Sequence, residues 1–322
     1  MKPLAGVLVV DLTRYLPGPF ASRELLRLGA RVVRLEAPEG DPLREIAPGW
    51  DAALNAGKES VAFDLKDDPE FGRALCSRAD VVLDGFRPGV AQRLGIGAAQ
   101  LPNTVVYCSI TGFGSAGRHA GRAGHDLNYL GWAGALADTA PALPPVQIAD
   151  LGAGALAAVA QILAALYERE RTGSGRRIEI SMTHGSHHFV AHRTAGEPLG
   201  RLLTGGLACY SIYETADGRH LTVTAVEPKF FRRLCELIGR EELFRRQYAP
   251  EAQREIAAVL AETFAAKPLA AWLELFDSED VMVGPVATLE EAAAEFGEPP
   301  VTEPAPLLGE HTDAWRSELG LA

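Results

Sequence analysis

Three side chains in the sequence could carry acid–base chemistry: His125, Asp150 and Glu227. His125 lies in the stretch AGHDLNYLG, Asp150 in QIADLGAG and Glu227 in TAVEPKFF. Histidine and carboxyl groups suit proton transfer because their surroundings can bring their pKa values near the working pH. His125 also has an ordinary interpretation as a loop residue, with Asp126 capping a helix whose first turn is Leu127-Asn128-Tyr129.

The two carboxylates have ordinary interpretations as well. Asp150 precedes a long run of small and apolar residues that predicts a helix. At the N-terminus of that helix the carboxylate would be held ionised by the helix dipole, or it would serve only as the N-cap. Glu227 ends a predicted strand directly before Pro228, where a carboxylate needs no functional role. Individually, none of the three residues establishes a site.

Composition and charge limit the class of protein. The chain has 322 residues, 47% hydrophobic and 23% charged, as in globular enzymes. This length predicts about two domains. The net charge of −11 argues against a nucleic-acid partner. Residues 1–150 carry 15 Lys/Arg against 17 Asp/Glu and residues 151–322 carry 16 against 25, so an anionic ligand is expected in the first half.

No stretch of the sequence predicts membrane insertion. The most apolar run, 151–166, is rich in alanine, leads into charged residues and is expected to form a buried core helix. The apolar run near the N-terminus predicts a first strand and not a signal peptide, because Asp11 and Arg14 follow it. The cysteines show no metal-ligand or redox spacing, which predicts free thiols and a cytoplasmic protein. They are Cys76, Cys108, Cys209 and Cys235.

The first half of the chain alternates β-branched runs with helical patterns. A first strand, a helix entered at Pro17 and Pro19 and ended by Gly29, and a second strand form a βαβ unit. The pattern predicts strands at 7–11, 31–35, 60–64, 81–84 and 105–110, with helices at 69–79 and 90–94. This alternation is typical of a doubly wound, Rossmann-like α/β domain with a parallel sheet.

The second half predicts a smaller module. A loop rich in Gly, Pro and Ala spans 112–145, followed by a helix over 151–171 that stops at Gly173 and a strand over 177–182. A polar connection over 194–206 marks a domain boundary. A hairpin of 210–214 and 220–226 and helices near 229–238, 251–265 and 269–276 follow. We therefore predict a large domain, residues 1–190, and a small α+β domain, residues 205–290.

Common cofactor and nucleophile motifs do not occur. The first strand is not followed by GxGxxG, and the sequence has no P-loop, HExxH, CxxC or GxSxG. The sheet is therefore of a nucleotide-binding type without the dinucleotide fingerprint. Neither a metal nor a serine nucleophile is supported.

Ten short sequence motifs occur in order along nearly the whole chain, and together they resemble those of a known protein family. They read DLTRYLPGPFAS, LGARVVRLEAP, NAGKESVAFDLK, DGFRPGVAQRLGI, YCSITGFGSAG, AGHDLNYLG, IADLGAG, ERERTGSGRRIEISM, YETADGRHLTVTAVEPKFF and GPVATLEEA. Together they resemble the family III CoA-transferases (the CaiB/BaiF family), and more narrowly its α-methylacyl-CoA racemase branch.

The resemblance implies that Asp150 is the shared active-site carboxylate. In the transferases it is a nucleophile that attacks the acyl-CoA thioester and forms an acyl-aspartyl anhydride. In the racemases His125 and Asp150 flank the α-carbon, one removing a proton and the other returning it on the opposite face. Glu227 then partners the histidine. Transferases more often carry Asn-Asp or a related pair at Glu227-Pro228, so the resemblance favours the racemase.

The racemase reading fits elementary chemistry. A proton beside a thioester is weakly acidic, so its transfer needs a base, an acid and a stabilised enolate. A neutral imidazole and a protonated carboxyl on opposite faces supply this in either direction, with no metal and no cofactor beyond the CoA of the substrate. Two alternatives stay open: a CoA-transferase that moves CoA between carboxylic acids, and a CoA-ester binding protein that has lost catalysis.

The resemblance also implies which cations bind the CoA phosphates. Each could equally be a solvated surface residue, although Arg34 and Arg87 follow predicted strands at the edge where α/β sheets bind ligands. The complete set is Arg34, Lys58, Lys66, Arg87 and Arg93.

The resemblance further implies an interlocked homodimer. Residues 292–322 would return to the large domain, and Glu227 of one chain would meet His125 of the other. The sequence departs from the family pattern in three places. It is trimmed after Met182, it has Ala56 where an arginine is usual, and Thr183-His184-Gly185 with His187 and His188 replaces Asp-Gly. We interpret these histidines as a helix start near the interface and not as a metal site.

Overall fold

The structure is a computed structural model of the chain, and it describes residues 2–196, 202–297 and 304–321. Its contacts divide the chain into one unit of Met1–Ala191 with Pro300–Ala322 and a second unit of His192–Pro299. Helix α12 (Leu289–Phe296) falls within the second of these units, and the domain bounds expected from the sequence stay predictions.

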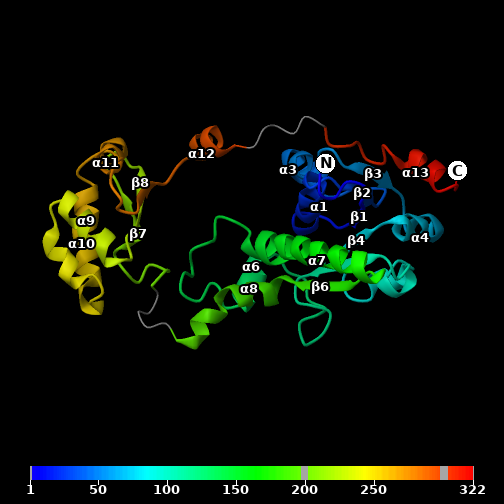
Figure 1. Ribbon diagram of the computed structural model, residues 1–322, viewed down its shortest axis with the longest axis horizontal. Coiled ribbons are helices and arrows are strands. Elements are labelled where there is room, and N and C mark those ends of the chain that lie inside the picture. The colour runs from blue at the N-terminus through cyan, green and yellow to red at the C-terminus, as the bar shows by residue number, and fades with distance from the viewer. Residues whose placement is uncertain (1, 197–201, 298–303, 322) are drawn as a thin grey trace. The chain divides into compact units, whose positions relative to one another are not determined.

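The first unit contains a six-stranded parallel sheet with the order β3-β2-β1-β4-β5-β6 (Figure 1). This order reverses between β1 and β4, and α/β sheets bind ligands beyond the carboxyl ends of the strands at such a point. The predicted Rossmann-like fold is confirmed. The strands are β1 (Leu8–Leu12), β2 (Arg31–Glu36), β3 (Glu59–Ala62), β4 (Val81–Asp84), β5 (Val106–Thr111) and β6 (Arg177–Ser181).

Helices cover both faces of this sheet, because successive residues of each strand point to opposite sides. Val9 packs with residues of α1 and α7 on one face, and Val10 packs with residues of α4 and α13 on the other. The bounds are α1 (Pro17–Arg27), α2 (Leu43–Ile46), α3 (Pro48–Asn55), α4 (Pro69–Arg78), α5 (Val90–Arg93), α6 (Asp126–Trp132), α7 (Ala157–Thr172), α8 (Met182–Val190) and α13 (Thr312–Glu318).

A π-helix, η2 (Ala149–Leu156), runs directly into α7. The joined segment Ala149–Thr172 is the one continuous helix among the described residues that is long and apolar enough to span a membrane, and half of its apolar window is buried. The predicted end at Gly173 is confirmed, because this residue adopts a φ of 71° and caps α7.

The C-terminal helix α13 attaches to the edge strand β3, and Figure 1 shows the two side by side. Trp315 is 1% exposed, and its indole N–H donates to Glu59 Oε2 at 2.6 Å. The Arg31 guanidinium lies 4.2 Å from the ring centroid of Trp315. The last residues of the chain thus complete the core of the first unit.

The second unit is the predicted α+β module. Its antiparallel sheet has the order β7-β8-β9, and the β7–β8 register begins with Tyr210 opposite Thr224. Phe231 and Phe264 are fully buried in its core. The elements are β7 (Tyr210–Glu214), β8 (His220–Thr224), α9 (Pro228–Leu237), α10 (Gln253–Phe264), α11 (Leu269–Phe276), β9 (Val283–Pro285) and α12. All four cysteines are buried free thiols, as predicted.

Candidate active site

Asp150 lies in the first turn of η2 and not at its N-cap position, which Ile148 occupies. π-helical turns are rare and occur frequently at functional sites. Small residues fix this segment against α8: a Cβ atom added to Gly185 would lie 2.8 Å from the Cβ atom of Ala153. The IADLGAG stretch therefore serves close packing of η2, which sets the position of the Asp150 carboxyl.

Asp126 brings the predicted His125 and Asp150 segments together. Helix α6 begins at Asp126 and His125 is its N-cap, so the expectation that Asp126 caps this helix is wrong. The side chain of Asn128 instead accepts a 3.1 Å hydrogen bond from the His125 backbone N–H. Asp126 Oδ1 accepts a 2.9 Å hydrogen bond from the Asp150 backbone N–H. The residue next to His125 thus contacts the backbone of Asp150.

Burial, together with the negative charge of Asp126, raises the pKa of Asp150 to about 7. This shift runs against the expectation that a helix N-terminus holds the carboxyl ionised, because loss of solvation and a like charge both disfavour its charged form. Near neutral pH, Asp150 populates both protonation states. A group with this property can both accept and return a proton.

Tyr129 supports the segment that carries His125. Its ring is buried, and its hydroxyl donates to the backbone oxygen of Gly124. Gly112 gives the ring its space, since a Cβ atom there would lie 2.4 Å from a Tyr129 ring carbon. Burial, with the charges of Asp150 and Asp126, raises the pKa of Tyr129 to about 12. The phenol therefore stays neutral while it anchors the loop.

Asp126→Asn should lower the pKa of Asp150. The substitution removes the neighbouring charge but keeps an oxygen that can accept the Asp150 N–H. The pKa should stay above its ordinary value, because burial is the larger cause of the shift. Carbon-13 NMR titration of the Asp150 carboxyl measures this directly, with the exposed Asp67→Asn as a matched control. An identical titration curve in Asp126→Asn and the wild type contradicts the prediction.

An apolar cavity of about 440 Å³ lies beside this end of η2. Ile148 lines it, only two residues before Asp150. Phe189 and Val190 of α8 form another wall. The cavity was not foreseen because its lining comes from two separate stretches of the sequence, 130–148 and 186–190. The remaining lining residues are Leu130, Ala135, Leu136, Thr139, Ala142, Leu143, Pro144, Pro145 and Ser186.

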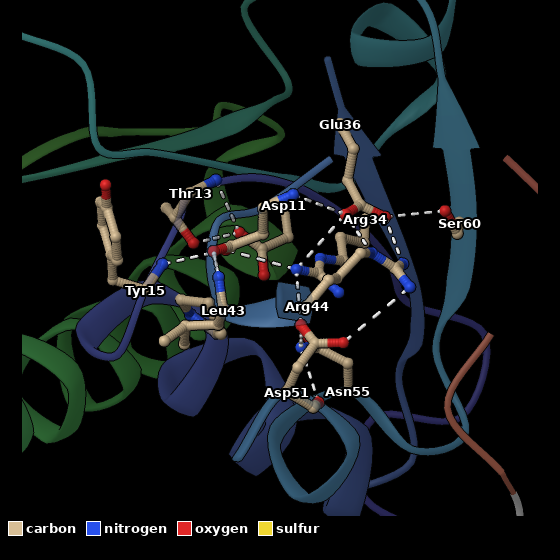
Figure 2. A network of polar contacts seen from close by, with 12 residues as sticks. Asp11, Thr13, Tyr15, Arg34, Glu36, Leu43, Arg44, Asp51, Asn55 and Ser60 are labelled. Carbon is tan, nitrogen blue, oxygen red and sulfur yellow. Dashed lines mark hydrogen bonds and ion pairs between the residues drawn. The ribbon is translucent and has the colours of Figure 1, made fainter. Parts of the chain in front are cut away.

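Arg34, expected to face a ligand at the sheet edge, is instead buried and 1% exposed. Its Nη2 atom lies 2.8 Å from Asp51 and 3.3 Å from both Glu36 and Asp41. Figure 2 shows the guanidinium between the carboxylates of Glu36 and Asp51. We call Arg34, Glu36, Asp41 and Asp51 the Arg34 cluster. Because these carboxylates compensate its charge, the structure does not support the predicted contact between Arg34 and a CoA phosphate.

Lys58 is also buried, contrary to the expected exposed position. Its Nζ donates to Pro19 O at 2.9 Å, Ser22 Oγ at 2.7 Å and Asn55 Oδ1 at 2.9 Å. It lies 3.7 Å from Asp11 Oδ2. Burial lowers the pKa of Lys58 to about 8. Lys58 therefore joins α1, α3 and β1 inside the unit and does not face a ligand.

The other three predicted cations are exposed. Arg87 follows β4 at the point where the strand order reverses, and it lines a cavity of about 140 Å³ together with Arg177 and Asp84. Arg93 ends α5, and Lys66 lies in the loop after β3. These positions are compatible with an anionic ligand, and the assignment to CoA stays a prediction.

Glu227 lies in the second unit, where it is exposed and forms the N-cap of α9. Its pairing with His125 would join the two units and stays a prediction. The predicted helix start at the histidine-rich stretch is confirmed, because α8 begins at Met182 and is capped by Ser181. No cluster of metal-ligating side chains is found within the described ranges of the chain.

The sequence matches the family model of CoA-transferase family III over residues 4–299. The chain belongs to this family and is an enzyme of the superfamily that contains CoA-transferases and acyl-CoA racemases.

Individual relatives carry both kinds of name. The chain is 35% identical to alpha-methylacyl-CoA racemase of Mus musculus, covering 95% of this chain and 86% of the relative. It is 30% identical to succinyl-CoA:glutarate CoA-transferase of Mus musculus, with coverages of 92% and 74%. The crystal structure of Rv3272 from M. tuberculosis superimposes with a TM-score of 0.85 at 29% identity, covering 98% of this chain and 99% of that one.

Proposed function

We propose that the protein is a racemase or epimerase of 2-methylacyl-CoA thioesters that acts by 1,1-proton transfer. The observation that carries this proposal is the Asp126–Asp150 contact beside His125. It places a carboxyl whose pKa is about 7 next to the segment that presents an exposed imidazole. A transferase nucleophile must be an ionised carboxylate, and a raised pKa disfavours that form.

In the proposed reaction, one of the two groups removes the proton from the α-carbon and leaves an enolate of the thioester. The other group delivers a proton to the opposite face of the same carbon. His125 takes the proton and Asp150 returns one in one direction, and their roles exchange in the reverse direction. Both groups must therefore change protonation state readily near the working pH, as Asp150 does.

The cavity beside η2 supports an apolar acyl group as the substrate. Its lining is almost entirely aliphatic or aromatic, and it begins two residues from the proposed proton carrier. An acyl chain attached to the reacting thioester would be removed from water there. We further propose that acyl-CoA is bound without another cofactor and that the chain works as an interlocked homodimer in the cytoplasm.

Phe189→Asp should raise KM about tenfold for a long-chain 2-methylacyl-CoA, because burying apolar surface against Phe189 contributes roughly 1.5 kcal/mol or more. A short acyl-CoA should show little change, since it does not reach this wall. Steady-state kinetics with a chain-length series tests this, with Ile46→Asp as a control at an exposed apolar position outside the cavity. Equal KM changes for short and long chains contradict an acyl role for the cavity.

Deuterium wash-in tests the reaction itself. The protein is incubated with one enantiomer of a 2-methylacyl-CoA in D₂O, and NMR follows the α-proton and the stereochemical purity. Exchange with racemisation, absent in His125→Ala and in Asp150→Ala, is the expected result.

The transferase is the second candidate, because relatives named as CoA-transferases match the chain at about 30% identity and the same Asp150 would be the nucleophile. Trapping with hydroxylamine during turnover separates the two. A hydroxamate on Asp150 together with no α-proton exchange would overturn the racemase proposal.

A further inference from the structure

The turn after β1 holds a strained residue at the ligand-binding edge of the sheet. Tyr15 has a φ of 64°, in the left-handed region that residues other than glycine rarely adopt. Such strain persists only where surrounding contacts enforce it, and it is frequent at functional sites. The turn follows β1, next to the point where the strand order reverses.

Two sets of contacts enforce this turn. On one side, the Tyr15 backbone N–H donates to Asp41 Oδ2 at 3.0 Å. On the other side, Thr13 donates its backbone N–H to the buried Asp11 at 2.9 Å. Gly18 packs so closely that a Cβ atom there would lie 1.9 Å from Thr13 Oγ1. The path of the chain from residue 13 to residue 18 is therefore fixed by side chains outside the turn.

The carboxylate that holds Tyr15 belongs to the Arg34 cluster. Arg34 Nη2 lies 3.3 Å from Asp41, whose other oxygen accepts a 2.9 Å hydrogen bond from the Leu43 backbone N–H. Arg44 donates to Glu36 at 2.7 Å and so ties a second cation into the same cluster. This buried cluster connects β2, α2 and α3 to the Tyr15 turn, and the proposed reaction gives it no role.

The ring held in this way faces His125. The two ring centroids are 6.4 Å apart and the ring planes meet at 86°, an edge-to-face arrangement. In Figure 2 the Tyr15 ring points away from the Arg34 cluster. Within the described ranges, Tyr15 is the only aromatic ring in contact with the His125 imidazole. Tyr15 is 45% exposed, so burial does not explain why an aromatic residue occupies a strained position.

We infer that Tyr15 is a positioning residue: the Arg34 cluster holds its strained turn, and its ring orients the His125 imidazole toward the reacting carbon. The claim that this orientation serves proton transfer rests on the proposed function. The orientation of the imidazole itself is a property of the free enzyme and does not depend on that function. The hydroxyl is not needed for the ring contact. Through Tyr15, the Arg34 cluster therefore fixes the orientation of the His125 ring before substrate binds.

The test uses the substituted chains without substrate and then in turnover. Tyr15→Leu should move the His125 ring resonance in an NMR spectrum of the histidine-labelled enzyme, with assignment by His125→Gln. It should also lower kcat about tenfold with little change in KM. Tyr15→Phe should restore both to within about twofold of the wild type. Tyr167→Leu, at an exposed tyrosine of α7, is the matched control and should change neither.

A second variant tests the link to the cluster. Asp41→Asn keeps an oxygen for the Tyr15 N–H but removes the charge that Arg34 holds. It should move the His125 resonance in the same direction as Tyr15→Leu. If Tyr15→Leu does not fold, Tyr15→Gly replaces it, because glycine adopts a positive φ without strain. An unchanged His125 resonance in the folded ring-less variant overturns the inference. Absence of α-proton exchange in the wild type overturns only the proposed function, since the resonance test needs no turnover.

Discussion

Asp150→Asn should lower the rate of α-proton exchange about a thousandfold while CoA binding persists. An amide neither accepts nor returns a proton, and loss of a positioned acid–base group costs roughly 10²- to 10⁴-fold. The shape of the side chain and the 2.9 Å hydrogen bond to the Asp150 backbone are retained, so η2 should keep its geometry. Deuterium exchange and CoA titration calorimetry measure the two properties separately. Asp67→Asn, an exposed residue, is the matched control.

The same substitution should stabilise the folded protein above neutral pH. The pKa of Asp150 rises from 3.8 to about 7 on folding, so the folded state binds this proton more tightly. The wild type therefore loses stability as the pH rises from about 4 to about 7, by up to about 4 kcal/mol, and the full penalty persists above that range. Asn carries no such penalty.

Urea unfolding at about pH 8 should consequently show Asp150→Asn to be more stable than the wild type, whereas the difference should vanish near pH 4. A variant that is less active and no more stable at about pH 8 would contradict the raised pKa. A carboxyl in a poorly solvated position lowers the stability of the folded protein while it supports activity, so its replacement is expected to raise stability and lower activity.

Lys58→Met should destabilise the first unit by about 3 kcal/mol, because breaking a buried ion pair leaves an uncompensated charge. Asp11 is 0% exposed and would lose its nearby cation, while Pro19 O and Asn55 Oδ1 would lose a donor. The loss should occur without any ligand. Chemical denaturation of the free protein measures it.

Lys66→Met separates this structural role from CoA binding. Lys66 is exposed, so its replacement should leave the unfolding free energy within about 0.5 kcal/mol of the wild type and weaken CoA binding. A free Lys58→Met protein of unchanged stability but with weakened CoA binding would restore the phosphate-binding prediction for Lys58.

The elements of the fold were accessible from local patterns. The predicted strand over 81–84 has the same bounds as β4, and the predicted strand over 210–214 has the same bounds as β7. β-branched runs bounded by turn residues specify such strands locally, and right-handed crossovers restrict how they combine. β9 was missed because three residues that include a proline give no strand pattern of their own.

The contacts and protonation of the site residues could not be predicted from local sequence patterns. Arg34 has the local sequence of a strand-end cation, and only the packing of α3 places Asp51 2.8 Å from it. Likewise, Asp126 and Asp150 are far apart in the chain, and their contact depends on how α6 approaches η2. Residue types suggested which groups react, whereas burial and neighbouring charge, which set their pKa values, required the folded chain.

The wide turns of η2 let this segment absorb the loss of one residue. In an α-helix each residue advances the side-chain direction by about 100°, and in a π-helix by less, so a one-residue deletion downstream of Asp150 that restored α-helical winding would leave the direction of the carboxyl relative to α7 nearly unchanged. The helix itself would survive with ordinary hydrogen bonds. A one-residue deletion at 151–156 would therefore change the winding of η2 far more than the direction of the carboxyl.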